Sequence, residues 1–80
     1  MTKLKQMRQH SGLTQSELAK KVNVNLRTLQ YYEQGVKQLD HARIDTILKI
    51  CLELGCDISD IMEEKEWITL YKKYADQLHA

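Results

Sequence analysis

The chain has 80 residues, of which 42% are apolar, and it contains three glycines and no proline. This length fits one small domain, and this apolar content is enough for a core and argues against disorder. No apolar run approaches the ~20 residues that a membrane-spanning helix needs, and the first residues lack the apolar stretch of a secretory signal. We therefore expect a cytoplasmic protein with no membrane partner.

The formal net charge of +1 hides an uneven distribution along the chain. Residues 1–37 carry seven Lys or Arg against two Asp or Glu, a net charge of +5, whereas residues 38–80 carry five against nine, a net charge of −4. A basic half and an acidic half suggest that one face meets a polyanion such as nucleic acid. Chance scatter in a small chain is the alternative, so the charge pattern decides nothing alone.

The first half of the chain is typical of consecutive short helices. Residues 2–11 are expected to form the first helix, with Gly12 as its stop. The second helix begins at Thr14, because Thr14 and Glu17 make a T-x-x-E capping box. The third begins at Asn25, a favoured N-cap residue, and ends before Gly35. All of these boundaries depend on local capping chemistry.

The second half continues the same pattern. The fourth helix is expected to start at Asp40 and to stop at Gly55, and the fifth to start at Asp57. An apolar residue precedes each of the last four caps, and another lies four positions into the helix, as in a hydrophobic staple. The four staple pairs are Leu13/Leu18, Val24/Leu29, Leu39/Ile44 and Cys56/Ile61.

Residues 15–35 have the pattern of a helix, a tight turn and a second helix. Their apolar positions form two helical patterns that are interrupted at Asn23. Asn tolerates the left-handed backbone that such a turn needs, second only to Gly. This arrangement is the helix-turn-helix unit, whose second helix can enter the major groove of DNA.

The stretch LKQMRQHSGLTQSELAKKVNVNLRTLQYYEQG resembles the Cro/phage-repressor type helix-turn-helix family, also called the XRE or lambda-repressor-like family. LDHARIDTILKICLELGCDISDIM continues the likeness through the fourth and fifth helices, so it covers about residues 4–62. Asn23 is a departure, since members usually have Gly there. The resemblance implies an all-α, five-helix DNA-binding domain over residues 1–63, with the helix-turn-helix unit at 14–34. A C-terminal helical extension over residues 64–80 follows it.

The same resemblance implies a sequence-specific DNA-binding transcriptional regulator that reads the major groove with its third helix, residues 25–34. The implied base contacts are Leu26, Arg27, Thr28 and Tyr31. The implied contacts to the DNA backbone are Gln15, Asn25, Gln30, Gln34 and Lys37. Arg8 and Glu33 match a structural ion pair between the first and third helices.

The chemistry of these side chains agrees with the implied roles. Arg27 can make a bidentate contact to guanine, and Leu26 or the Thr28 methyl group can meet a thymine methyl. The helix N-terminus favours a phosphate. Several have a plainer interpretation: Leu26 as an exposed first-turn residue, Gln30 and Gln34 as solvated polar residues. For Tyr31, a contact to DNA and a side chain without a role in DNA binding are evenly weighted.

The segment VNLRTLQYYEQG also resembles the recognition segment of MerR-like winged-helix proteins. In those proteins the motif lies almost at the N-terminus and a wing hairpin follows it. Here a full helix precedes the motif, and residues 36–40 lead directly into another helix. We therefore favour the Cro/phage-repressor type.

The last segment, EEKEWITLYKKYADQLHA, has apolar and aromatic residues at helical spacing. A further helix is expected, which packs either on its own core or against a partner subunit. Both options remain open at this point. Because related proteins commonly bind DNA as two-fold dimers, we expect a homodimer. The candidate dimer residues are Trp67, Leu70, Tyr71, Tyr74 and Leu78.

The sequence contains little that indicates catalysis. The three histidines, at 10, 41 and 79, belong to separate elements, and there is no glycine-rich phosphate loop. Cys51 and Cys56 have no second Cys pair and are expected to pack in the core as reduced thiols. We expect neither an enzyme nor a cofactor nor a metal site. The alternatives to a DNA-binding regulator are an antitoxin-like module that binds a protein partner and an assembly module that has lost DNA binding.

Overall fold

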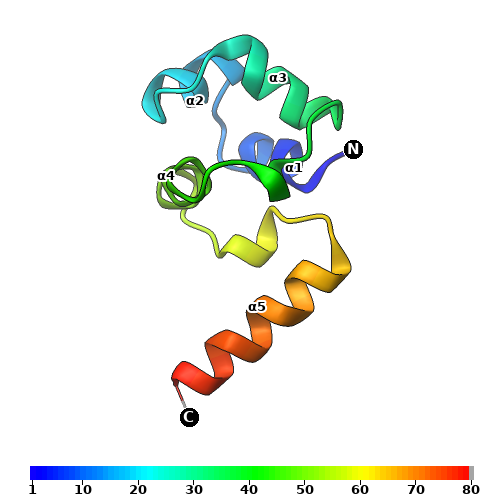
Figure 1. The fold of residues 1–80 in the computed structure, drawn as a ribbon. Helices are drawn as coiled ribbons and strands as arrows, with labels where there is room; N and C mark the ends of the chain where they lie inside the picture. The colour runs from blue at the N-terminus through cyan, green and yellow to red at the C-terminus, as the bar shows by residue number, and fades with distance from the viewer. Residues whose placement is uncertain (80) are drawn as a thin grey trace.

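The computed structural model describes residues 1–79, which form five α-helices and two 3-10 turns (Figure 1). The α-helices are α1 (Lys3–His10), α2 (Gln15–Lys21), α3 (Leu26–Gln34), α4 (Ile44–Leu54) and α5 (Lys65–Leu78), and the turns are η1 (Leu39–His41) and η2 (Ile58–Asp60). No strand occurs among residues 1–79, so the expected all-α class is confirmed. Within the same residues, no helix is long and apolar enough to cross a membrane.

The hydrophobic core is one cluster that draws side chains from α1, α2, α3, η1 and α4 and from the residues after η2. α2 packs on α3, and these two helices also contact α4 and α1 respectively. The helix-turn-helix unit therefore lies at one end of the molecule, and α5 projects from the other end (Figure 1). The largest fully buried side chains are Leu4, Leu18, Leu29, Ile50, Ile61 and Met62.

The predicted boundaries of α2 and α3 are confirmed. The Thr14 hydroxyl accepts a hydrogen bond from the Glu17 N–H, and the Glu17 carboxylate accepts one from the Thr14 N–H. Asn25 caps α3, and Gly35 ends it in the left-handed conformation. Asn23 has a φ of 56°, as the tight turn between the two helices requires.

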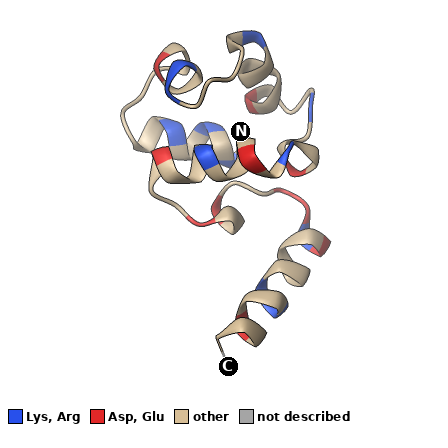
Figure 2. Cartoon of the chain, turned by 60° about the vertical axis from the view of Figure 1, so that its left-hand side comes forward, with Lys and Arg blue, Asp and Glu red and all other residues tan. Residues whose placement is uncertain are grey.

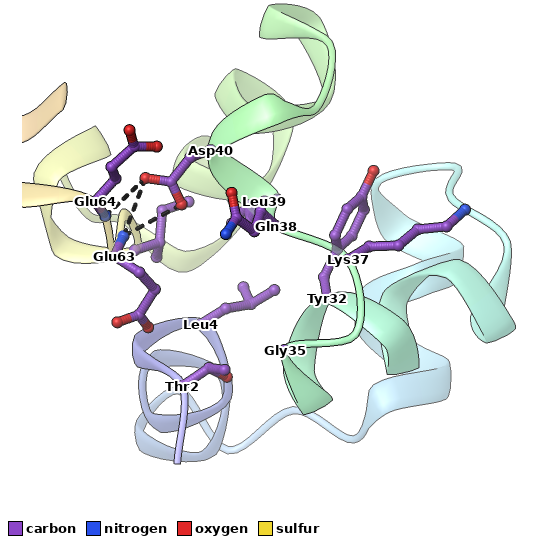
Figure 3. Close-up of a pocket in the computed structure, with 11 residues that line it drawn as sticks. Thr2, Leu4, Tyr32, Gly35, Lys37, Gln38, Leu39, Asp40, Glu63 and Glu64 are labelled. Atoms are coloured by element: carbon purple, nitrogen blue, oxygen red, sulfur yellow. Dashed lines mark hydrogen bonds between the residues drawn. The ribbon is translucent and has the colours of Figure 1, made fainter.

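The predicted start of the fourth helix at Asp40 is wrong. Residues 39–41 form the 3-10 turn η1, and α4 begins at Ile44, with Arg43 in the N-cap position. The carboxylate of Asp40 accepts hydrogen bonds from the backbone N–H groups of Glu63 and Glu64 at 3.0–3.3 Å (Figure 3). It therefore caps the chain entering α5 instead of its own helix, a partnership that spans more than twenty residues.

The staple predicted between Leu39 and Ile44 is wrong for the same reason. Leu39 is buried in the core, but Ile44 is the first residue of α4 and is 59% exposed. Ala42 directly precedes the true N-cap, and Ile47 lies four positions into α4; both pack in the core. The apolar residues that flank the start of α4 are thus Ala42 and Ile47.

The predicted start at Asp57 is confirmed, but the element that follows is shorter than expected. Asp57 and Asp60 form a capping box around η2, which is a single 3-10 turn. Beyond this turn Ile61 and Met62 are both buried. The segment expected as the fifth helix therefore contributes a capped turn and two core side chains.

The predicted C-terminal helix is α5, and its apolar residues divide into two groups. Trp67 and Ile68 pack against the core, and the Trp67 ring stacks on Tyr71 with centroids 5.6 Å apart. Leu70, Tyr74 and Leu78 are 61%, 61% and 62% exposed. Trp67 and Ile68 thus attach the first half of α5 in cis, whereas Leu70, Tyr74 and Leu78 have no covering partner among residues 1–79.

Candidate nucleic-acid interface

Helix α3 turns one side into the core and the other outward. Leu29 and Glu33 are buried, whereas Leu26 and Arg27 are exposed and Thr28 and Tyr31 are partly exposed. Arg27 and Tyr31 lie four residues apart, on the side of α3 opposite Leu29 and Glu33. The structure thus leaves the four residues predicted to contact bases accessible along one helix.

The N-terminus of α3 also faces outward. The Asn25 side-chain oxygen accepts a hydrogen bond from the Arg27 N–H at 2.8 Å, which satisfies one of the free donors of the first turn. The remaining first-turn N–H groups and the positive end of the helix dipole favour an anion here. Asn25 itself is exposed beside them.

Tyr31 brings two cationic side chains together on the outer surface of α3. The Arg27 guanidinium lies 5.9 Å and the Lys37 ammonium 5.8 Å from the centre of the Tyr31 ring. Arg27 also donates a 3.4 Å hydrogen bond to the Tyr31 hydroxyl. The Lys37 N–H donates to the Tyr31 carbonyl, which anchors the residue that carries the second charge. The result is a basic and aromatic cluster at the outer surface of α3.

A buried polar network fixes α3 from behind. The Arg8 guanidinium donates to both carboxylate oxygens of Glu33 at 2.7 and 3.0 Å, and to the Leu13 carbonyl at 2.7 Å. The Glu33 side chain is only 1% exposed and that of Arg8 only 9%. The Thr2 hydroxyl donates to the Glu33 carbonyl at 2.8 Å. The ion pair thus connects α1, α3 and the loop before α2.

Two glutamine side chains extend this network to the molecular surface. The Gln15 amide donates to Glu33 at 3.1 Å, and the Gln30 amide donates to the Gln15 oxygen at 3.5 Å. No buried side-chain nitrogen or oxygen within residues 1–79 lacks a partner. The sequence alone gave no sign of the Gln30 contact, because two polar residues fifteen positions apart carry no spacing signal. Gln34 and Lys37, the last two predicted backbone contacts, are exposed at the end of α3.

The charges of the chain are distributed unevenly over the elements. Lys and Arg residues lie on α1, α2 and the start of α3, whereas Asp and Glu dominate the segment between α4 and α5 (Figure 2). Lys20, Lys21 and Arg27 are exposed beside the helix-turn-helix unit, and Lys37 follows α3. The end of the molecule that carries α3 is therefore the more basic one.

A cavity of about 300 Å³ lies between the start of α1, the end of α3 and the residues that precede α5 (Figure 3). Leu4, Leu39 and Ile61 supply apolar walls. Its main polar groups are already engaged: Asp40 accepts from two backbone N–H groups, and Glu63 accepts from the Lys3 N–H at 2.6 Å. It offers a ligand few free partners, so the outer surface of α3 is the stronger candidate.

The cysteines pack as expected. Burial raises the pKa of the Cys51 thiol to about 12 and also raises the pKa of Cys56, so both are protonated at neutral pH. Within residues 1–79, no group of three or more His, Cys, Asp or Glu side chains is arranged to hold a metal ion.

The model of the helix-turn-helix family HTH_3 matches residues 4–61. The chain belongs to this family. The match confirms the resemblance to the Cro/phage-repressor type and ends before α5. Membership implies DNA binding and transcriptional regulation without enzymatic activity. A search of curated proteins and a search of solved structures each found no match.

Proposed function

We propose that this protein is a sequence-specific transcriptional regulator that acts in the cytoplasm as a homodimer and reads the major groove with α3. The observation that carries the proposal is the contrast between the two sides of α3. Its inner side is fixed by Leu29 and the buried Arg8–Glu33 pair, while its outer side presents Arg27 and Tyr31 without a partner from another helix. A base-reading helix needs both properties.

The base contacts in this proposal come from Leu26, Arg27, Thr28 and Tyr31. Arg27 supplies the planar donor pair that matches the O6 and N7 atoms of guanine. Leu26 and the Thr28 methyl group are apolar surfaces for a thymine methyl. The Tyr31 ring holds Arg27 in a defined direction before DNA arrives.

Contacts to the DNA backbone flank these residues. Asn25 and the free N–H groups of the first turn meet a phosphate at one end of α3, and Gln34 and Lys37 meet one at the other. Gln15 and Gln30 bond each other, so they would present their remaining donors to the backbone as a pair. Such contacts set position and orientation, not sequence.

A two-fold dimer would place two copies of α3 in successive major grooves, with half-sites ~34 Å apart. The exposed residues of α5 support the dimer, since Leu70, Tyr74 and Leu78 are large apolar side chains that residues 1–79 leave uncovered. They equally fit an antitoxin-like role, in which α5 grips another protein. Co-purification of a stable heterologous protein from the native host would favour that second function.

The proposal is tested by selecting DNA from a random pool with the full chain and titrating the selected site with salt. We expect an enriched two-part consensus and binding that weakens steeply as salt rises, because Lys and Arg displace counterions from phosphates. Absence of an enriched consensus, or affinity that salt does not change, would contradict reading by α3. The second result would favour an assembly module without DNA binding.

A further inference from the structure

Helix α4 carries an apolar surface that the sequence did not predict. Ile44, Leu48 and Leu52 are 59%, 45% and 84% exposed. They lie four residues apart and so form one line along the helix, here called the α4 stripe. The residues of α4 that pack in the core are different ones, namely Ile47, Ile50, Cys51 and Leu54.

Leu70, Tyr74 and Leu78 form a second line with the same spacing, here called the α5 stripe. Each stripe spans eight residues beyond its first, which corresponds to ~12 Å of helix. Residues 1–79 leave both stripes exposed. Trp67 packs on the core and the Tyr71 hydroxyl bonds the Asp57 carboxylate at 2.9 Å, so these two residues attach the first half of α5.

The α4 stripe borders a groove between α4 and α5. A depression of about 400 Å³ lies between the C-terminal half of α4 and the middle of α5. Leu48 and Leu52 line it from α4, Ile58 from η2 and Tyr71 from α5. The α4 stripe therefore continues into an apolar hollow that a side chain from outside can enter.

We propose that a second copy of this chain covers both stripes by exchange: the α5 stripe of each protomer packs against the α4 stripe of the other, around a two-fold axis. The proposal rests on the homodimer of the proposed function and adds the surface that forms it. Because the contact is reciprocal, it closes after two copies and leaves neither stripe exposed.

The lengths of the two stripes and the surface area that they can bury are consistent with this pairing. The stripes match in length and spacing, so three side chains of α5 can lie along three of α4. Covering six such side chains on each protomer removes on the order of 1,000 Å² or more of accessible surface, which reaches the range of specific protein interfaces.

The net charges of the helices favour packing of α4 on α5 over packing of α4 on α4 or of α5 on α5. Helix α4 carries one Lys against one Asp and one Glu, a net charge of −1, whereas α5 carries three Lys against one Asp and one Glu, a net charge of +1. Packing α4 on α4, or α5 on α5, would place like charges together, while α4 on α5 places opposite ones together. Pairing α5 with α5 alone would also leave Leu52 exposed.

The position of α5 leaves the DNA-reading surface free. α5 projects from the end of the molecule opposite α2 and α3 (Figure 1). Contacts made along it do not cover Arg27 or Tyr31. The α5 part of the dimer surface is therefore separate from Arg27 and Tyr31, and dimerisation can be measured without DNA.

The test is sedimentation velocity on the full chain without DNA. Leu52→Asp and Tyr74→Lys each place a charge in one stripe, and each is expected to weaken dimerisation about tenfold or more. An equimolar mixture of the two variants should dimerise again, because one half of the heterodimer is unaltered and the other pairs opposite charges. Val36→Asp, at an exposed apolar residue outside both stripes, is the matched control and should leave the dimer intact.

Far-UV circular dichroism checks that each variant is folded, and Ile44→Asp or Leu78→Lys replaces any that is not. A monomeric wild type at ~100 μM, far above the concentration at which a regulator dimer of ~1 μM Kd assembles, would overturn the proposal. So would a Leu52→Asp protein that dimerises like the wild type, or variants that do not restore each other. Retention of selected DNA by a monomeric wild type would overturn the exchange alone and leave reading by α3 standing.

Discussion

Helix α3 is fixed by a buried charged network, whereas helix α5 is attached through aromatic packing and hydrogen bonds near the surface. Behind α3, Glu33 bonds residues of α1 and α2, and the outer side chains are the ones that we propose contact DNA. On α5, Trp67 and Ile68 meet the core, whereas the apolar side chains of Leu70, Tyr74 and Leu78 remain exposed. Rigidity and exposure are therefore combined on α3, as base reading needs, while α5 is suited to meeting another protein surface.

Breaking the network behind α3 should have the largest effect. Glu33→Ala leaves the nearly buried Arg8 without its partner, so we expect a loss of ~3–5 kcal/mol in the free energy of unfolding. Urea denaturation followed by circular dichroism measures it. Arg43→Ala, which breaks a surface pair with Asp45, is the control and should cause no measurable change. Equal losses in the two variants would mean that Glu33 does not anchor α3.

Removing the cap on the segment before α5 should have an intermediate effect. Asp40→Ala leaves the N–H groups of Glu63 and Glu64 without their acceptor, which should cost ~1–2 kcal/mol and act locally. Amide hydrogen exchange should then accelerate in residues 63–68 more than in α3. Uniform acceleration over the whole chain would show that the two regions do not open separately.

Substitution of Lys37 tests whether the outer surface of α3 binds DNA, and the measurement does not depend on the stability of the fold. Lys37→Gln removes one phosphate contact per protomer, so the slope of log affinity against log salt should fall by ~1 for each chain. Lys72→Gln changes an exposed lysine of α5 and is the matched control, with an unchanged slope. Equal slopes for wild type and Lys37→Gln would remove Lys37 from the proposed DNA surface.

The attachment of α5 by Tyr71 should give the smallest effect. Hydrogen bonds from Ser59 and then Tyr71 hold the pKa of the Asp57 carboxyl below its usual value, although burial opposes the shift. Because the folded-state pKa is depressed, this contribution is present above the usual pKa of Asp and is lost as the pH falls through the lowered one.

Tyr71→Phe should therefore lower the free energy of unfolding by ~0.5 kcal/mol at neutral pH, and the deficit should disappear in acid. Thermal melts at pH 7 and pH 2 make the comparison. A deficit that persists in acid would mean that the hydroxyl acts through another partner than the Asp57 carboxylate.

The sequence predicted best the features that depend on near neighbours. The caps at Thr14 and Asn25 and the turn at Asn23 were predictable because their hydrogen bonds and backbone angles are set within a few residues. Asp40 looked like another N-cap, but its partners at 63 and 64 are brought to it only by the fold.

The exposed surfaces of α4 and α5 likewise depend on contacts that only the fold creates. Helical periodicity placed Trp67 and Tyr74 on one face of α5, but it could not say how much of that face the core would cover. The sequence did not reveal the exposed α4 stripe, because Ile44 was expected four positions into the fourth helix as the staple partner of Leu39. On α3, the resemblance to the Cro/phage-repressor type indicated which residues face outward, whereas the Gln15–Gln30 contact required the packed structure.

Reading of bases by α3 is tested most directly by the DNA consensus that the Arg27→Ala protein selects from a random pool. We expect the consensus to lose one guanine in each half-site, with discrimination there reduced by ~1–3 kcal/mol, while the other positions persist. Arg43→Ala should select the same consensus as the wild type. An Arg27→Ala protein that selects the wild-type consensus with undiminished preference at every position would show that Arg27 of α3 does not read a base.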